Sequence, residues 1–376
     1  MRQQLNDKAG IGQTLNNMGE VYLGLSQADK ASEVLQQALA IRRELKDRKG
    51  EGETLDNLGS VYLLKSQYDK ALETFQQALA ISREVKDRAG EGRTLRKIGV
   101  TYSNLKQNPK ALEIYNQTLA IQQEVGDKFQ AGYTLFSIAV TYDDLQDYPR
   151  TLEWSKKSLA ASREVGNRFL EYRVLNLIST TYGIKGDKER AVEFLQQSLA
   201  IQREIKDSSS QLGTLTMIMV FGSKASDLYS KGFYSQARAE APHDIKLAQD
   251  VLQMARELKQ PDKEAFVLQK LGRVYYILGD YNKATEFLQQ SLKIARQIKE
   301  LQTETTALSL LSSIYRDQGK DRQIIELSQR KIEIAREQKD PLSEASSLNV
   351  LASIYTELGE YEKGIELYQQ ALAKAR

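Results

Sequence analysis

The chain has 376 residues, and its 53 lysines and arginines nearly balance its 50 aspartates and glutamates, which leaves a net charge of +3. So small a net charge argues against a protein that binds nucleic acid or an anionic membrane surface. There is no cysteine and a single histidine, His243, so disulfides, thiolate zinc sites and multi-histidine metal sites are excluded. We expect no cofactor and no metal.

No apolar run approaches the ~18 residues that a membrane-spanning helix needs. The first residues also lack the apolar segment of a signal peptide. With only five prolines in the chain, long stretches are free to form helix. We therefore expect a cytoplasmic, mostly helical protein.

The sequence repeats itself every 40 residues. Tyrosine keeps this period through the first five units and again through the last three, and a column of small residues keeps it as well. The repeated tyrosines are Tyr22, Tyr62, Tyr102, Tyr142, Tyr182, Tyr275, Tyr315 and Tyr355. The small column runs Gly19, Gly59, Gly99, Ala139, Ser179, Gly272, Ser312 and Ala352.

Each unit has the pattern of two helices. In the second unit, Leu55, Leu58 and Tyr62 follow helical spacing, and Ala71 and Phe75 begin a second helical pattern after a short turn. One such hairpin cannot bury its apolar face alone, so the units must stack on one another. The small residues would let the two helices of a hairpin approach closely.

The junctions between units carry turn and cap signals. Gly50 and Gly52 follow one such junction and weaken helix by ~1 kcal/mol each, so the first helix could begin before or after them. Prolines at the turn inside two hairpins, Pro109 and Pro149, suit a first helical turn. The plausible N-cap residues are Asp47, Asp87, Asp127 and Asp207.

The sixth unit is longer than the others, and two interpretations are open. In one, both arms of the hairpin are longer, with extra turns near residues 214–223 and around Pro242. In the other, the unit is an irregular joint with breaks at Gly222 and Pro242.

The ends of the chain resemble parts of a repeat. Residues 1–10 align with residues 41–50, and the second helix of the last unit stops at Arg376. We expect the chain to be an excerpt of a longer protein, or a solenoid that has lost its capping units. Leu5 and Leu372 would then lie in incomplete helices with unshielded apolar faces, which predicts end-to-end association between chains.

The repeated pattern resembles the tetratricopeptide repeat. Leu58, Gly59 and Tyr62 match the first helix of that motif, and Ala71 and Phe75 match its second. The spacing of 40 residues looks like the longer-repeat subclass, which includes kinesin light chains, spindle-orientation scaffolds and bacterial signalling proteins that often carry a protease-like or ATPase effector.

The resemblance implies an all-α, right-handed solenoid of about nine hairpins, a single array over residues 1–376 that binds a protein or peptide in its concave groove. We expect the repeats near residues 13–46, 53–86, 93–126, 133–166, 173–206, 213–260, 265–299, 305–339 and 345–376.

In this arrangement two ladders of first-helix residues face the groove. One lies six residues before the repeated tyrosines and includes Asn16, Asp56, Arg96, Phe136, Asn176 and Ser223. The other lies nine residues before them and includes Gln13, Glu53, Arg93, Tyr133 and Arg173.

The third to fifth units stand out, because arginine forks bind carboxylates and exposed aromatic rings supply apolar anchors. We expect an acidic segment to bind there, with side chains pointing into solvent in the free form; packing between units is the alternative. Within the resemblance, Asn17 and Asn57 stand where related repeats hold a peptide backbone, and Lys97 replaces the asparagine in the third unit. The predicted partner-binding residues are Arg93, Arg96, Lys97, Tyr133, Phe136, Arg173, Asn176, Asn17 and Asn57.

Enzymatic chemistry has little support in the sequence. No Gly-x-x-x-x-Gly-Lys-Ser/Thr phosphate loop is present, and His243 with Asp244 and Ser235 is the only imaginable hydrolytic group. We predict a non-enzymatic interaction module. The alternative is a regulatory sensor domain of a larger signalling protein with an effector domain.

Overall fold

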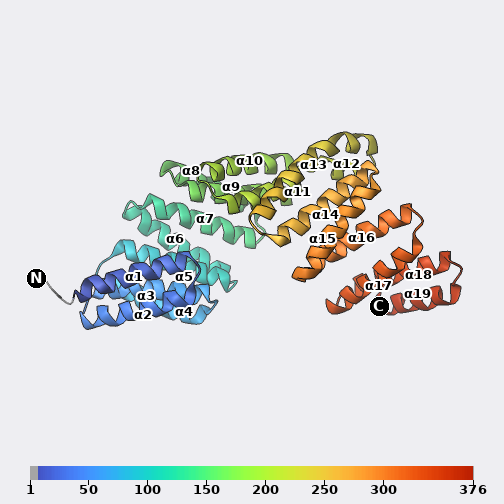
Figure 1. Ribbon diagram of the computed structural model, residues 1–376. Coiled ribbons are helices and arrows are strands. Elements are labelled where there is room, and N and C mark those ends of the chain that lie inside the picture. Colours follow the sequence, from blue (N-terminus) through green and yellow to red (C-terminus); the bar gives the residue numbers. More distant parts are fainter. Residues whose placement is uncertain (1–6, 376) are drawn as a thin grey trace, which may run out of the picture. The chain divides into compact units, whose positions relative to one another are not determined.

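The computed structural model describes residues 7–375, and these form nineteen helices and no strand (Figure 1). Two compact units divide after Ile205, and each is described by itself. Each consists of stacked helix hairpins, which confirms the predicted all-α solenoid. That the units continue one another as a single array stays a prediction. No helix in the described range is long and apolar enough to cross a bilayer.

The first unit contains five hairpins of almost identical length. Consecutive helices run antiparallel and pack on their neighbours in the stack. The helices are α1 (Lys8–Gly24), α2 (Ala28–Glu44), α3 (Arg48–Leu64), α4 (Tyr68–Glu84), α5 (Arg88–Asn104), α6 (Asn108–Glu124), α7 (Lys128–Asp144), α8 (Tyr148–Glu164), α9 (Arg168–Ile184) and α10 (Lys188–Glu204).

The second unit begins with the irregular repeat and continues with three regular hairpins. Its helices are α11 (Ser208–Gly222), α12 (Lys224–Ser230), α13 (Tyr234–Glu257), α14 (Pro261–Leu278), α15 (Tyr281–Ile298), α16 (Leu301–Asp317), α17 (Asp321–Glu337), α18 (Pro341–Glu357) and α19 (Tyr361–Ala375).

The predicted N-caps are present, and they show where the first helix of each hairpin begins. The Asp47 carboxylate accepts a hydrogen bond from the Gly50 amide at 2.9 Å, and Asp87 caps Gly90 in the same way. The helices therefore start before the glycines, which lie in the first turn. Asp127 and Asp207 are also N-caps, and Pro109 lies in the first turn of its helix.

The small-residue column lets the two helices of each hairpin touch. A Cβ atom added to Gly59 would lie 2.5 Å from the Phe75 ring, and one added to Gly99 would lie 2.5 Å from the Tyr115 ring. Phe75 and Tyr115 are fully buried. This confirms that the column exists for close packing.

A buried glutamate ties each of several successive hairpins together. Glu51 accepts from Arg43 of α2 at 2.9 Å and from Arg48 of α3 at 2.7 Å. The glutamates that bridge two cations in this way are Glu51, Glu91, Glu171, Glu304 and Glu344. We call each of them, with its two cations, a glutamate bridge. At the joint between α6 and α7, Gln123 and Ala131 take the places of the arginine and the glutamate, so no bridge forms there.

The irregular repeat combines the two interpretations made from its sequence. The first arm is broken after Gly222, where Ser223 adopts an extended conformation (φ −70°, ψ 92°) before α12 starts. The break is held by Asp244, whose carboxylate accepts from the Ser223 hydroxyl at 2.8 Å and the Ala225 amide at 3.1 Å. The break expected at Pro242 is wrong, because α13 runs through it.

Candidate functional site

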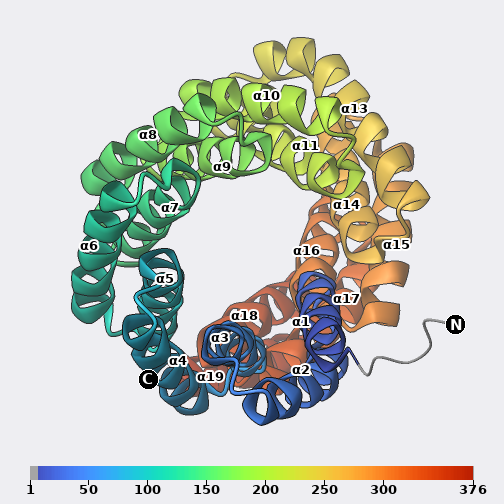
Figure 2. The same ribbon diagram turned by 90° about the vertical axis from the view of Figure 1, so that its left-hand side faces the viewer.

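The first helices of the first unit line its concave wall. In Figure 2, α5, α7 and α9 lie on the inner side of the curved stack and α6, α8 and α10 on the outer side. One cavity of about 480 Å³ lies against α1, α3 and α5, and a second of about 250 Å³ against α5, α7 and α9. The first, the polar pocket, is lined by residues that include Gln13, Asn16, Glu53, Asp56, Arg93 and Lys97. The second, the aromatic pocket, is lined by residues that include Arg96, Tyr115, Tyr133, Phe136 and Arg173.

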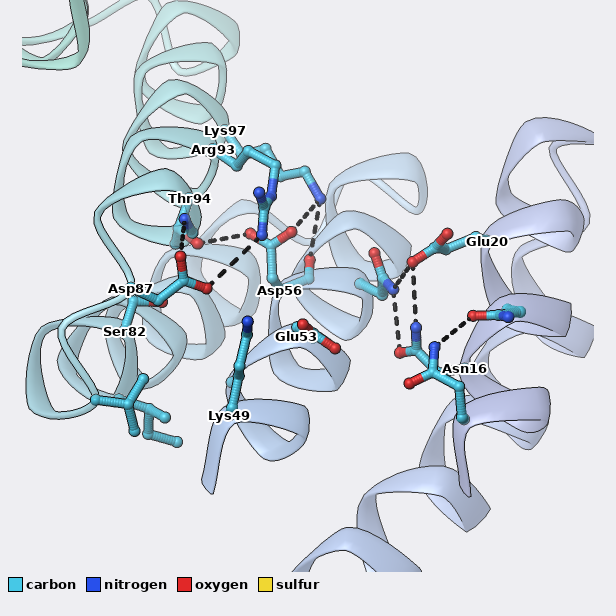
Figure 3. A pocket seen from close by; sticks show the side chains of 17 residues that line it. Asn16, Glu20, Lys49, Glu53, Asp56, Ser82, Asp87, Arg93, Thr94 and Lys97 are labelled. Atoms are coloured by element: carbon cyan, nitrogen blue, oxygen red, sulfur yellow. Dashed lines mark hydrogen bonds and ion pairs between the residues drawn. The ribbon is translucent and has the colours of Figure 1, made fainter. Parts of the chain in front are cut away.

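Residues of both predicted ladders in the first unit therefore line the two pockets, but many of their polar groups are already paired. Ser223, predicted in one ladder, instead lies at the helix break of the second unit. At one end of the polar pocket, Asn57 donates to Asn16 at 3.2 Å and to Glu20 at 2.9 Å (Figure 3). Asn57 is buried, so its amide N–H groups are committed to these partners. Asn17 is exposed and accepts from Gln13 at 2.7 Å. Of the two asparagines, Asn17 is the one open to a ligand.

The middle of the polar pocket contains charges of both signs. The Lys97 ammonium is paired with Asp56 at 2.5 Å, and the Thr94 hydroxyl donates to the same carboxylate at 2.8 Å (Figure 3). Lys97, which we predicted to bind a partner, is thus already paired with a carboxylate of the preceding repeat. Arg93 lies 3.9 Å from Asp87, a loose pair that leaves most of its N–H groups open to the pocket.

The buried guanidinium of Arg42 holds two residues of the concave wall in place, a role that the sequence pattern did not predict. It reaches from α2 to Glu53 at 3.1 Å and to Gln13 at 2.8 Å, which fixes two ladder residues. No periodic signal marks it, because the equivalent positions hold Ser82, Gln122, Ser162 and Gln202.

The aromatic pocket joins arginines and rings from successive repeats. The Arg96 guanidinium lies 5.9 Å from the centre of the Tyr133 ring, and that of Arg173 lies 5.0 Å from the centre of Phe136. No carboxylate lines the pocket, and neither arginine has an ion pair within residues 7–375. Burial lowers the pKa of Arg96, and its Nε atom has no acceptor.

We expected these side chains to point into solvent, but two of them do not. Arg96 and Phe136 are half-buried, because each is covered by a stacked group from the next first helix. Arg173, by contrast, is exposed. Arg96 and Phe136 therefore pack between successive repeats, which was the alternative to free exposure in the groove.

Two exposed phenylalanines extend the aromatic surface and were missed. Phe129 and Phe169 are 47% and 48% exposed, and the Phe129 ring lies 5.5 Å from that of Tyr133. Each stands four residues before a ladder residue, so continuing the ladder by one helical turn would have found them. Asn176 of α9, a predicted site residue, lines neither pocket, and its Oδ1 atom is buried without a hydrogen-bond donor.

The imagined hydrolytic group is not assembled. His243 is exposed, while the buried Asp244 carboxylate is directed at Ser223 and the Ala225 amide, where it caps α12. Across the described residues, no cluster of three or more His, Asp or Glu side chains is arranged to hold a metal ion.

A family model described as tetratricopeptide repeat matches residues 10–84, 50–124, 130–204, 245–297 and 303–376. The chain belongs to the tetratricopeptide repeat family. The matched segments leave the irregular repeat largely uncovered, in keeping with its broken first arm. No curated protein sequence matches the chain significantly.

Solved structures with a similar fold include three proteins from Pyrococcus and Bacillus. A signal transduction ATPase with a tetratricopeptide repeat sensor from Pyrococcus horikoshii has a TM-score of 0.67 and 16% identity, over 96% of this chain and 53% of that one. The apo quorum sensor NprR from B. thuringiensis has a TM-score of 0.53 and 16% identity, over 97% and 98%. Aspartyl phosphate phosphatase F from Bacillus subtilis has a TM-score of 0.51 and 14% identity, over 100% and 96%. At these identities the likeness shows the fold alone.

Proposed function

We propose that this protein is a non-catalytic interaction module whose concave wall in the first unit binds an extended protein segment. The segment would carry an acidic residue at the aromatic pocket and would continue along the polar pocket. The observation that carries the proposal is the presence of Arg96 and Arg173 around one cavity that no carboxylate lines.

The two arginines of the aromatic pocket lack an anionic partner within the described part of the chain. A guanidinium that is partly removed from water is stabilised by a charge-assisted hydrogen bond to a carboxylate. Arg96 has a buried Nε atom without an acceptor, and the rings of Tyr133 and Phe136 hold the arginines in position. A carboxylate between them would complete the hydrogen bonds, and the half-exposed Phe129 and Phe169 would pack against its apolar neighbours.

The test begins with affinity capture of partners and continues with titration of synthetic segments from the captured protein. Phe136→Ala should weaken binding by about 1–3 kcal/mol, as for a typical apolar anchor. Gln76→Glu, on the exposed face of α4, is the matched control and should bind like the parent. If Phe136→Ala stays folded and binds as tightly as the parent, the assignment of the groove at these repeats is wrong.

The second candidate function is that of a sensor domain in a larger signalling protein. The likeness to the ATPase from Pyrococcus horikoshii supports it, because this chain matches the fold of about half of that protein. The domain content of the full-length protein distinguishes the interaction module from the sensor domain. A fused ATPase or protease-like domain favours the sensor.

We also propose that the protein is cytoplasmic and that its chains associate with one another. Four apolar side chains on α19 form one exposed stripe at helical spacing: Tyr361, Ile365, Tyr368 and Leu372. Leu5, which we expected at the other end of such a contact, lies among residues 1–6, outside the described residues. A second copy would cover the stripe with a first helix, as α5 covers the equivalent face of α4.

A further inference from the structure

The break in the irregular repeat opens a small cavity in the second unit. About 200 Å³ in volume, it lies between the α11–α12 break, α13 and α14. Ser226 and Ser230 of α12 line it, together with Lys270 and Arg273 of α14. The cavity is separate from the groove of the first unit, and none of its residues belongs to the proposed peptide site.

The repeat pattern explains why Lys270 faces this cavity without a counter-ion. Lys270 stands five residues before a repeated tyrosine, as Lys97 does. Lys97 is paired with Asp56, which lies six residues before the tyrosine of the preceding repeat. In the irregular repeat that position is Ser223, whose hydroxyl is instead donated to Asp244. No carboxylate therefore stands at the position equivalent to Asp56, although a lysine is present at the position equivalent to Lys97.

Arg273 adds a second positive charge on the same face of α14. The side chains of Lys270 and Arg273 are half-buried, and neither has a hydrogen bond or ion pair within the part of the chain that the structure describes. Burial and the charge of Arg273 lower the pKa of Lys270. Its ammonium lies 4.9 Å from the centre of the Phe266 ring, which holds it at the cavity wall.

Two acidic residues, Asp227 and Asp244, also line the cavity. Asp244 is almost fully buried and accepts two hydrogen bonds from the break. Burial raises the pKa of Asp244. Its carboxyl group is hydrogen-bonded to the helix break and makes no ion pair with Lys270 or Arg273 in the described residues.

We infer that the cavity between α12 and α14 binds a small oxyanion, which takes the place that the Asp56 carboxylate occupies beside Lys97. Lys270 and Arg273 of α14 and the Ser226 hydroxyl of α12 would donate to it, while the Ser230 hydroxyl already donates to the backbone carbonyl of Asp227 at 2.8 Å. Phosphate and carboxylate share this chemistry, and the cavity volume limits the ligand to a single small group of either kind.

The experiment is a titration of the whole chain with inorganic phosphate and, separately, with acetate, followed by calorimetry and by the midpoint of thermal unfolding. Potassium chloride at matched ionic strength is the reference. A ligand that binds only the folded state raises the unfolding midpoint, so phosphate or acetate should raise it above chloride. The anion that raises the unfolding midpoint more shows whether the cavity prefers a phosphate or a carboxylate.

Three variants complete the test. Lys270→Met keeps the aliphatic stem, removes the charge, and should weaken binding about tenfold or more, as expected for a lost hydrogen bond between charged groups. Ser226→Asp should supply an internal carboxylate, raise the unfolding midpoint without added anion, and abolish the response. Lys293→Met, an exposed lysine on α15, should respond like the parent. The inference is overturned if neither anion exceeds chloride, if Lys270→Met keeps the response, or if Lys293→Met loses it equally.

Discussion

The guanidinium of Arg173 on α9 lies 5.0 Å from the centre of the Phe136 ring on α7. This contact joins the fifth repeat to the fourth, as Arg96 over Tyr133 joins the third to the fourth. A cation over a ring keeps its N–H donors at the edge of the guanidinium plane. The arginines are thus held in position before a ligand arrives, which reduces the entropy lost on binding.

Replacing Arg173 by glutamate should weaken binding of an acidic segment without unfolding the protein. Arg173 is exposed and has no ion pair in the described range, so its loss costs little stability, while reversal of its charge repels a carboxylate. We expect a loss of about 2 kcal/mol or more, typical of an interface hot spot. Fluorescence anisotropy at two salt concentrations measures it. Binding by the parent should weaken with salt because exposed charges are screened over ~8–10 Å, and a salt-independent affinity would argue against an ionic contact.

Replacing Arg96 by glutamate should affect both stability and binding. The side chain is half-buried against Tyr133, so a carboxylate there would be partly desolvated beside an aromatic ring. We expect the free energy of unfolding to fall by about 1–3 kcal/mol. Chemical denaturation checks this, with Arg173→Glu as the exposed counterpart. Equal stabilities of the two variants would mean that Arg96 is not packed as described.

Enlarging Gly59 should force a hairpin apart. A Cβ atom at this position would lie 2.5 Å from the buried Phe75 ring, and overpacking of this kind costs about 1–3 kcal/mol. Gly59→Ala should therefore destabilise the protein, and Gly59→Leu should do so more. Gly213→Ala is the matched control, because nothing lies within 4 Å of a Cβ atom there. A lower melting temperature for Gly213→Ala than for Gly59→Ala would contradict the packing role of the small column.

The glutamate bridges predict a loss of stability in acid. At Glu304, burial alone would raise the pKa, but hydrogen bonds from Arg330 and Arg296 outweigh it and lower the pKa below its usual value of 4.5. A lowered pKa in the folded state stabilises the protein above the unfolded pKa, and this stability is lost as the pH falls through the folded value. Glu304→Gln should therefore reduce stability at pH 7 and flatten its decline below about pH 4.5.

Denaturant titrations over this pH range measure the effect. Glu326→Gln, an exposed glutamate on α17, should behave like the parent. An unchanged pH profile in Glu304→Gln would show that the bridge contributes nothing to the acid response.

The stripe on α19 predicts association that depends on concentration. Leu372 is 54% exposed and Ile365 is 58% exposed, and contiguous apolar surface of this kind favours contact with another chain. Leu372→Lys should shift the equilibrium toward monomer in sedimentation velocity. Gln369→Lys, which adds the same charge on α19 at an exposed polar position, should not. A parent that sediments as a monomer at every concentration rules this association out.

The hairpins and the wall of the groove could be predicted because the packing that defines them recurs every 40 residues. Gly59 and Asp47 each carry a local requirement, a close approach and a helix cap, that leaves a trace in a column of the sequence. The pairing of Lys97 with Asp56 could not be predicted in this way, because it depends on side-chain conformations on two different helices. Arg42 was missed for the related reason that it acts in one repeat alone.

The course of the irregular repeat was also beyond local reasoning. A proline inside a helix costs ~3 kcal/mol, which made Pro242 a reasonable break. The helix nevertheless continues, because Ala237, Ala241 and Ala248 on either side are buried against their neighbours. Tertiary contacts outweighed the local preference there, whereas after Gly222 the Asp244 carboxylate stabilises a break by accepting from Ser223 and the Ala225 amide.

The missing glutamate bridge at the joint of α6 and α7 has a mechanical consequence. In the first unit the other joints are fastened by Glu51, Glu91 and Glu171, so the hairpins on either side of them resist bending together. Where Ala131 replaces the glutamate, resistance falls mainly to apolar contacts, and the stack becomes most compliant between its third and fourth hairpins. The Arg96–Tyr133 contact crosses this same joint. A segment bound in the aromatic pocket would contact the hairpins on both sides of this joint and would therefore restrict bending there.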